Sequence, residues 1–124
     1  MIQYEWRKAE FTNGTSGWIC KMTSRRRKIG AAHVVYNRRK KDGLVLGALH
    51  IKPQYQRQRY GKQLLQHIID EVSPDWSELR LMVQPFADKA MDVQELVRFY
   101  QRFGFVQMPS RSEWPIMRRL LFQE

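Results

Sequence analysis

The fold is decided by residues 49–62, which read Leu49-His50-Ile51-Lys52-Pro53-Gln54-Tyr55-Gln56-Arg57-Gln58-Arg59-Tyr60-Gly61-Lys62. The apolar run 44–51 is typical of a buried strand, and Pro53 ends it. Beyond this point the apolar residues recur at the spacing of an amphipathic helix: Tyr60, Leu64, Leu65, Ile68, Ile69 and Val72. The stretch is therefore predicted to carry the chain from a strand into a helix.

The segments that follow predict a second strand and a second helix. Residues 79–83 alternate between apolar and polar side chains, as a half-buried strand does. Asp92, with Glu95 three residues later, forms the pattern of a capping box, and Gly104 is placed to end the helix that it opens. Two closing strands are expected, at 105–108 and 116–122.

The segments before residue 49 predict strands joined by turns. The expected strands are 2–6, 18–23, 29–36 and 44–51. Turns are expected at Asn13-Gly14 with Gly17, at the charged run 24–28, and at Asp42-Gly43. The order is therefore a front half of strands followed by a β-α-β-α-β-β arrangement.

Length and charge restrict the class of protein. The chain has 124 residues, 43% of them hydrophobic, which fits one compact domain spanning 1–124. Its 22 Lys and Arg against 12 Asp and Glu leave a formal charge of +10, which favours anionic partners such as phosphates or nucleic acid. A single cysteine, Cys20, cannot form an internal disulfide and is expected to be a core residue in a reducing, cytoplasmic setting. We expect no metal site, no signal peptide and no membrane span.

The passage from strand to helix is also a candidate anion site. A helix N-terminus presents unpaired backbone N–H groups at the positive end of the helix dipole. Arg57, Arg59 and Lys62 add charge there, and Gly61 would let a backbone-bound anion approach closely. The alternative interpretation is a solvated basic turn before an ordinary amphipathic helix.

Two motifs resemble those of the GNAT superfamily of acyl-CoA-dependent N-acetyltransferases. Residues 56–61 resemble the family signature R/Q-x-x-G-x-G/A, with Arg59 where the first glycine is expected. Tyr100 lies four residues before Gly104-Phe105, as a family tyrosine does. The resemblance covers roughly Ile29 to Leu121. The segment 99–105, with Met117 and Leu120-Leu121, also resembles the toxin branch that acetylates aminoacyl-tRNA.

The resemblance implies an α+β fold with a mixed, mostly antiparallel sheet and a central β-α-β-α unit. Family members usually place two helices between the first two strands, but residues 8–18 are too few for both. The N-terminal region is therefore expected to be shortened, with an open substrate side that suits a large acceptor or a homodimer. Arg25–Lys28 and the loop 56–61 should lie at one end of the sheet, and Arg38–Lys41 at the other, about 26 Å away for roughly 8 strand residues.

The resemblance also implies an acetyl-CoA site. The backbone at Leu49, His50 and Ile51 would bind the pantetheine arm and the thioester oxygen, and the amine would attack the thioester directly. The pyrophosphate would be held by Gln56, Arg57, Gln58, Arg59, Tyr60, Gly61 and Lys62. Arg59 would remove backbone freedom there while adding a permanent charge.

Tyr100 is the expected catalytic acid, which would protonate the departing thiolate. A phenol with an unperturbed pKa of about 10 keeps its proton at neutral pH. The alternative is that Tyr100 is a core aromatic residue on the apolar helix face with Leu96 and Phe103, and the spacing of these residues, taken alone, favours this alternative.

His50 is the candidate base, because its unperturbed pKa of about 6.5 suits proton transfer. If its strand alternates regularly, His50 shares a face with Ala48 and Leu46 and is equally well read as structural. His33 and His67 are expected to be structural.

The sequence therefore predicts an acetyl-CoA-dependent N-acetyltransferase that acts on a primary amine. The excess positive charge favours an amine on, or bound to, an anionic macromolecule such as aminoacyl-tRNA or another nucleic acid. The alternative is a catalytically inactive GNAT-fold basic module that binds nucleic acid or blocks a protein partner. Acetylation of a small molecule is a third possibility.

Overall fold

The computed structural model describes residues 1–39, 43–56, 58–84 and 92–121. Within these ranges one seven-stranded sheet has the order β1-β2-β3-β4-β5-β7-β6. Two α-helices, α1 (Tyr60–Val72) and α2 (Val93–Gln101), and a short 3-10 turn, η1 (Pro53–Tyr55), complete the described elements. The strands are β1 (Ile2–Glu10), β2 (Thr15–Ser24), β3 (Arg27–Asn37), β4 (Leu44–Ile51), β5 (Glu78–Met82), β6 (Val106–Met108) and β7 (Ile116–Leu120).

The sheet is antiparallel except at its centre. β1 to β4 form an antiparallel meander, α1 connects β4 to a parallel β5, and β7 then pairs antiparallel with both β5 and β6. The predicted α+β class, the mixed and mostly antiparallel sheet and the central β-α-β-α unit are confirmed. β1 passes directly into β2 through a short turn with no helix between them, as the short spacer predicted.

Local details differ from the sequence expectation at two turns. Gly17 lies inside β2 opposite Val35, so the first turn is made by Asn13-Gly14 alone. The charged run 24–28 contains a turn of only two residues, Arg25 and Arg26, both with positive φ. The flanking residues of that run extend β2 and β3, because strand pairing satisfies backbone groups that a longer loop would leave open.

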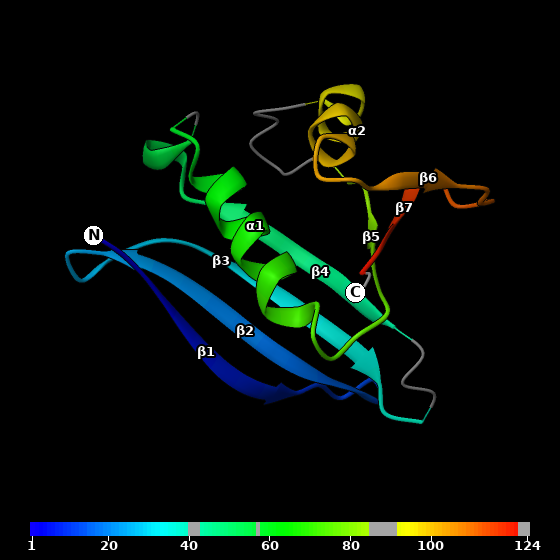
Figure 1. Cartoon of the computed structure of the whole chain (residues 1–124), viewed down its shortest axis with the longest axis horizontal. Coiled ribbons are helices and arrows are strands. Elements are labelled where there is room, and N and C mark those ends of the chain that lie inside the picture. The colour runs from blue at the N-terminus through cyan, green and yellow to red at the C-terminus, as the bar shows by residue number, and fades with distance from the viewer. Residues whose placement is uncertain (40–42, 57, 85–91, 122–124) are drawn as a thin grey trace.

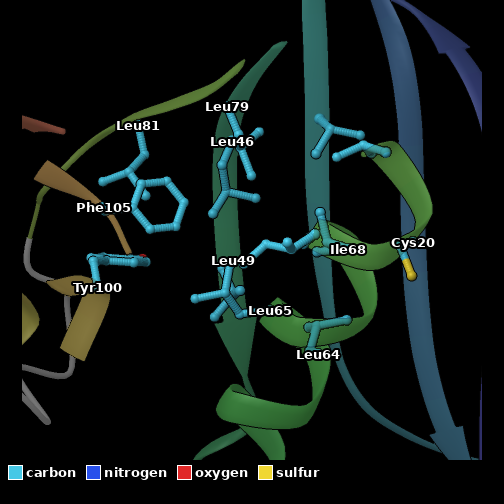
Figure 2. Close-up of a cluster of buried hydrophobic side chains, with 14 of the residues drawn as sticks. Cys20, Leu46, Leu49, Leu64, Leu65, Ile68, Leu79, Leu81, Tyr100 and Phe105 are labelled. Atoms are coloured by element: carbon cyan, nitrogen blue, oxygen red, sulfur yellow. The ribbon is translucent and has the colours of Figure 1, made fainter. Parts of the chain in front are cut away.

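Buried strand side chains gather on the face of the sheet that carries the helices. One register row, Trp6, Cys20, Ala32 and Leu49, crosses four strands on this face, and its last three members are buried. Figure 1 shows α1 lying over β3 and β4 and running roughly along them, while α2 lies toward β6 and β7. The buried side chains of α1 pack against β3 and β4 (Figure 2).

The neighbouring register row faces the other way. It contains Glu5, Lys21, Ala31 and His50, with a 3.0 Å ion pair between Lys21 Nζ and Glu5 Oε2. Neither helix of the described chain covers this face. We call it the bare face. No described helix is both long enough and apolar enough to cross a lipid bilayer.

β4 contains an extra residue at Gly47. Ala48 pairs with His33 while Leu46 pairs with Val34, so Gly47 is left without a partner in β3 as a β-bulge. The bulge inverts the alternation of side chains along the strand. Leu46 and Leu49 are both buried, whereas His50 lies on the bare face with Ala48. The expectation that His50 shares a face with Leu46 was therefore wrong.

Candidate active site

The N-terminus of α1 has no side-chain cap. Its N-cap residue, Arg59, has φ 68° and ψ 5°, and no acidic residue lies in the first turn. The Gln63 N–H donates to Arg59 O at 3.1 Å, so the N–H groups of the three preceding residues, Tyr60 to Lys62, have no partner inside the helix. These donors and the helix dipole make the end of α1 attractive to an anion.

Arg59 adopts the left-handed backbone that a glycine would adopt most easily. For an L-residue this conformation costs about 1 kcal/mol. The sequence indicated that Arg59 limits the loop's backbone freedom, and the structure shows the strained conformation in place. Arg59 and Lys62 are exposed and carry positive charge at the helix end, whereas Arg57 lies outside the described residues.

A second basic segment lies at the same end of the sheet. Gly30 pairs with Ile51, and the Lys52 N–H donates to Ile29 O at 2.8 Å. The β2-β3 turn at Arg25-Arg26 therefore lies near the end of β4, as predicted. Arg38 lies at the opposite end, where its N–H donates to Gly14 O. Lys40 and Lys41 of that cluster lie outside the described residues.

The last part of β4 has a free edge. β5 pairs only with Leu44 to Leu46, so its ladder ends before the bulge. Consecutive N–H groups of a strand point in opposite directions, and Lys52 N–H points toward β3. The N–H groups of Leu49 and Ile51 consequently point away from β3, toward the side that β5 leaves open.

Two contacts connect this edge to the helices. The Gln56 side-chain Nε2 donates to Ile51 O at 3.0 Å, which fixes the connecting loop against the end of β4. A Cβ placed on Gly61 would lie 3.9 Å from both Ile51 Cγ1 and Phe99 Cζ. The end of β4, the first turn of α1 and the side of α2 therefore meet at Gly61.

Tyr100 lies on α2 with 7% of its surface exposed. Its ring meets Phe105 edge-on, with centroids 5.7 Å apart, and Figure 2 shows it pointing from α2 toward Leu49 of β4. Burial raises the pKa of the Tyr100 phenol to about 12, so the group is neutral at physiological pH. Within the described chain its hydroxyl makes no hydrogen bond. Tyr100 is thus the core aromatic that its spacing predicted, directed toward the proposed cofactor strand.

Local sequence signals position α2 and therefore Tyr100. Asp92 Oδ1 accepts a hydrogen bond from the Glu95 N–H at 2.8 Å, which confirms the predicted cap. At the other end Gly104 has φ 88°, as the predicted C-terminal glycine should.

The remaining candidate residues are spread around this centre. Leu49 and Ile51 are buried, Tyr60 is half-buried and Gln58 is exposed. His50 is exposed on the bare face, whereas Tyr100 lies on the helix face, so the two candidate catalytic side chains lie on opposite sides of the sheet. The described residues contain no cluster of His, Cys, Asp and Glu that could hold a metal ion.

Cys20 can be set aside as a nucleophile. It is 1% exposed, and burial, reinforced by Glu71, raises the pKa of its thiol to about 12. The sequence did not predict two features of the site: the bulge at Gly47 and the contact of Phe99 with the start of α1. A glycine inside an apolar strand was the available signal for the first.

Comparison with known proteins agrees with this geometry. The profile of the acetyltransferase (GNAT) domain matches residues 14–107. No significant match was found among curated protein sequences.

Solved structures share the fold at low identity. A GNAT family acetyltransferase from Elizabethkingia anophelis, determined with acetyl-CoA bound, aligns with a TM-score of 0.69 at 12% identity over 97% of this chain and 98% of its own. The ribosomal-protein-S18-alanine N-acetyltransferase from Escherichia coli aligns with a TM-score of 0.68 at 23% identity, over 87% of this chain and 71% of its own. These likenesses show the fold alone and give no evidence for the toxin-type branch. The profile match, which spans most of the sequence, shows that the chain belongs to the GNAT family of acetyltransferases.

Proposed function

We propose that this protein is a cytoplasmic, acetyl-CoA-dependent N-acetyltransferase whose acceptor is a primary amine on, or bound to, an anionic macromolecule. The observation that carries the proposal is the position of the uncapped, basic N-terminus of α1 beside the free edge of β4. Residues 1–124 would then form one catalytic domain.

The residues present fit the chemical groups of acetyl-CoA. A diphosphate needs N–H donors and positive charge, which the first turn of α1, Arg59 and Lys62 supply. An amide-containing arm needs strand-like backbone partners, which Leu49 and Ile51 offer on the free edge. When bound, acetyl-CoA supplies the activated acetyl group.

The chain's own groups would then act on charge and protons. The Leu49 and Ile51 backbone N–H groups are held rigidly by the sheet and would stabilise negative charge on an acyl oxygen. Tyr100, neutral because of its raised pKa, would donate its proton to the departing sulfur. His50 would accept a proton from an amine that approaches across the bare face.

Charge and shape support a large anionic acceptor. The chain carries a formal charge of +10, and basic residues lie at both ends of the β3 strand. The bare face leaves room for an acceptor such as aminoacyl-tRNA, or for a second copy of the chain in a homodimer. Sedimentation with and without RNA distinguishes these two uses of the face.

Calorimetry with acetyl-CoA tests the cofactor. We expect saturable binding, weakened at least about tenfold by the double variant Arg59→Ala/Lys62→Ala. The matched control Arg38→Ala/Arg39→Ala removes the same charge from the other end of the sheet and should bind normally. No binding at about 1 mM acetyl-CoA would reject the proposal.

Product analysis tests the acceptor. Transfer of acetyl groups to aminoacyl-tRNA, but not to spermidine or free amino acids, is the expected result. Steeply salt-dependent RNA binding with no acetylation and no need for acetyl-CoA would favour the inactive basic module instead. Acetylation of small amines alone would point to the small-molecule alternative.

A further inference from the structure

A cavity lies at the opposite end of α1 from the candidate active site. Its volume is about 270 Å³, and three of the chain's four tryptophans form part of its wall. The lining residues are Trp6, Trp18, Glu71, Val72, Asp75 and Trp76. We call this the tryptophan pocket.

The tryptophans are held in place by neighbouring rings. Trp6 Nε1 donates to His67 Nε2 on α1 at 2.9 Å, and His67 in turn stacks on Tyr4 with ring centroids 3.7 Å apart. Trp18 and Trp76 both pack against Tyr36, at centroid distances of 5.7 and 5.1 Å. The aromatic wall is therefore built before any ligand arrives.

The loop after α1 fixes the acidic side of the pocket. The backbone N–H groups of Asp75 and Trp76 both donate to Val72 O at 3.1 Å. These bonds satisfy a carbonyl at the helix end and attach the Asp75 carboxylate and the Trp76 indole to the same turn. Rigid attachment reduces the entropy lost when a ligand binds.

The pocket is negative in a strongly positive protein. Glu71 and Asp75 are exposed, and neither forms an ion pair with any residue in the described ranges. The last turn of α1 contains no basic residue, so the negative end of the helix dipole adds to these charges. Lys8, which faces Trp18 across the β1-β2 ladder, is exposed and leaves both carboxylates unpaired.

We propose that the tryptophan pocket binds the alkylammonium group of an organic cation. Aromatic faces attract such a group through their quadrupole, and the two carboxylates supply the opposite charge. The pocket lies at the last turn of a 13-residue helix, about 20 Å at 1.5 Å per residue from the first turn of α1, where the proposed diphosphate site lies. It is therefore a second ligand site and does not depend on the proposed acetyl acceptor.

The central experiment compares a cation with its neutral isostere. The full chain is titrated with choline and with 3,3-dimethylbutan-1-ol, and binding is followed by tryptophan fluorescence and calorimetry. Choline should bind at least about tenfold more tightly, because only it carries the charge that the rings and carboxylates attract. The net positive charge of the protein repels cations in general, so tight choline binding requires a local site.

Two further titrants identify the source of the ammonium group. Spermidine represents a free polyamine, and a lysine-containing peptide represents a side chain of a partner protein. Binding of either one at the pocket supports the proposal and names the source.

Variants place the binding in the pocket. Trp76→Leu should lower the affinity for choline about 3- to 30-fold. Trp76→Phe keeps an aromatic ring, so its affinity should fall less. Glu71→Gln/Asp75→Asn removes the charge without removing packing, so it remains informative if Trp76→Leu folds poorly. Trp114→Phe, outside the pocket, is the matched aromatic control.

Acetyl-CoA binding serves as an independent readout. It should be unchanged in Glu71→Gln/Asp75→Asn, so a failure of this proposal is distinguishable from a failure of the proposed acetyltransferase activity. Equal binding of choline and its neutral isostere, no binding of any cation, or choline binding that these variants leave unchanged would each overturn the proposal.

Discussion

The two helices carry their charges in opposite senses. In α2, Asp92 caps the N-terminus, Glu95 lies in the first turn and Arg98 in the last, which is the arrangement that the helix dipole favours. In α1, Arg59 and Lys62 lie at the N-terminal end and Asp70 and Glu71 near the C-terminal end, against the dipole. The charges of α2 thus stabilise the helix itself, whereas those of α1 are available to ligands of opposite sign.

Burial explains how α1 tolerates this arrangement. Unfavourable charges at a helix end cost roughly 0.3 to 1 kcal/mol each. Burying one large aliphatic side chain contributes about 1.5 to 3 kcal/mol. Five such side chains of α1 are buried: Leu64, Leu65, Ile68, Ile69 and Val72. Packing therefore sets the stability of α1 and leaves its ends free to serve binding.

The largest expected effect lies on α2. Tyr100→Phe keeps the ring against Phe105 but removes the proposed proton donor, so turnover should fall about 10²- to 10⁴-fold. Acetyl-CoA affinity, measured by calorimetry, should change little, because α1 and β4 hold the proposed cofactor groups. Tyr36→Phe is the matched control and should keep normal turnover. Unchanged turnover in Tyr100→Phe would remove the role assigned to this residue.

The next effect tests the packing of α1. Leu65→Ala should lower the free energy of unfolding by about 2 to 5 kcal/mol, because Leu65 is fully buried. Urea denaturation measures the change. Gln66 is the exposed neighbour of Leu65, so the control variant Gln66→Ala should lower the free energy of unfolding by less than about 0.5 kcal/mol. Equal losses in the two variants would contradict the view that burial outweighs the reversed charges.

The left-handed N-cap of α1 predicts a smaller effect of defined sign. Arg59→Gly relieves the strained backbone and should raise the free energy of unfolding by about 0.5 to 1 kcal/mol relative to Arg59→Ala. Both variants lose the positive charge, so both should bind acetyl-CoA more weakly. Thermal and urea unfolding of the pair isolate the backbone contribution, and equal stability would show that Arg59 is unstrained.

Charge reversal at the helix ends tests the comparison itself. Lys62→Glu and Glu71→Lys should each stabilise the folded protein by about 0.3 to 1 kcal/mol at low salt, with a smaller effect at high salt. In α2 the equivalent change, Glu95→Lys, should destabilise it by a similar amount. A loss of stability in Lys62→Glu would mean that local contacts outweigh the dipole. Each stabilised α1 variant should bind its ligand less well, acetyl-CoA at the first end and choline at the second.

Local sequence patterns were sufficient to predict the helices and the basic N-terminal end of α1. The period of the apolar residues placed α1, the Asp92-Glu95 pair and Gly104 placed α2, and the basic residues marked the start of α1. These features depend on residues a few positions apart, whose interactions form within a single helix or turn. The same locality explains why Tyr100 could be assigned to the apolar side of α2 before any tertiary contact was known.

Only the tertiary structure decided the rest of the site. The Gly47 bulge, the free edge of β4 and the face that His50 occupies depend on strand register, which pairs residues far apart in the chain. The tryptophan pocket joins β1, β2, the last turn of α1 and the loop that follows it, and none of these segments contains it alone. The sequence determined elements whose stabilising contacts are local, and the fold determined every feature that requires distant segments to meet.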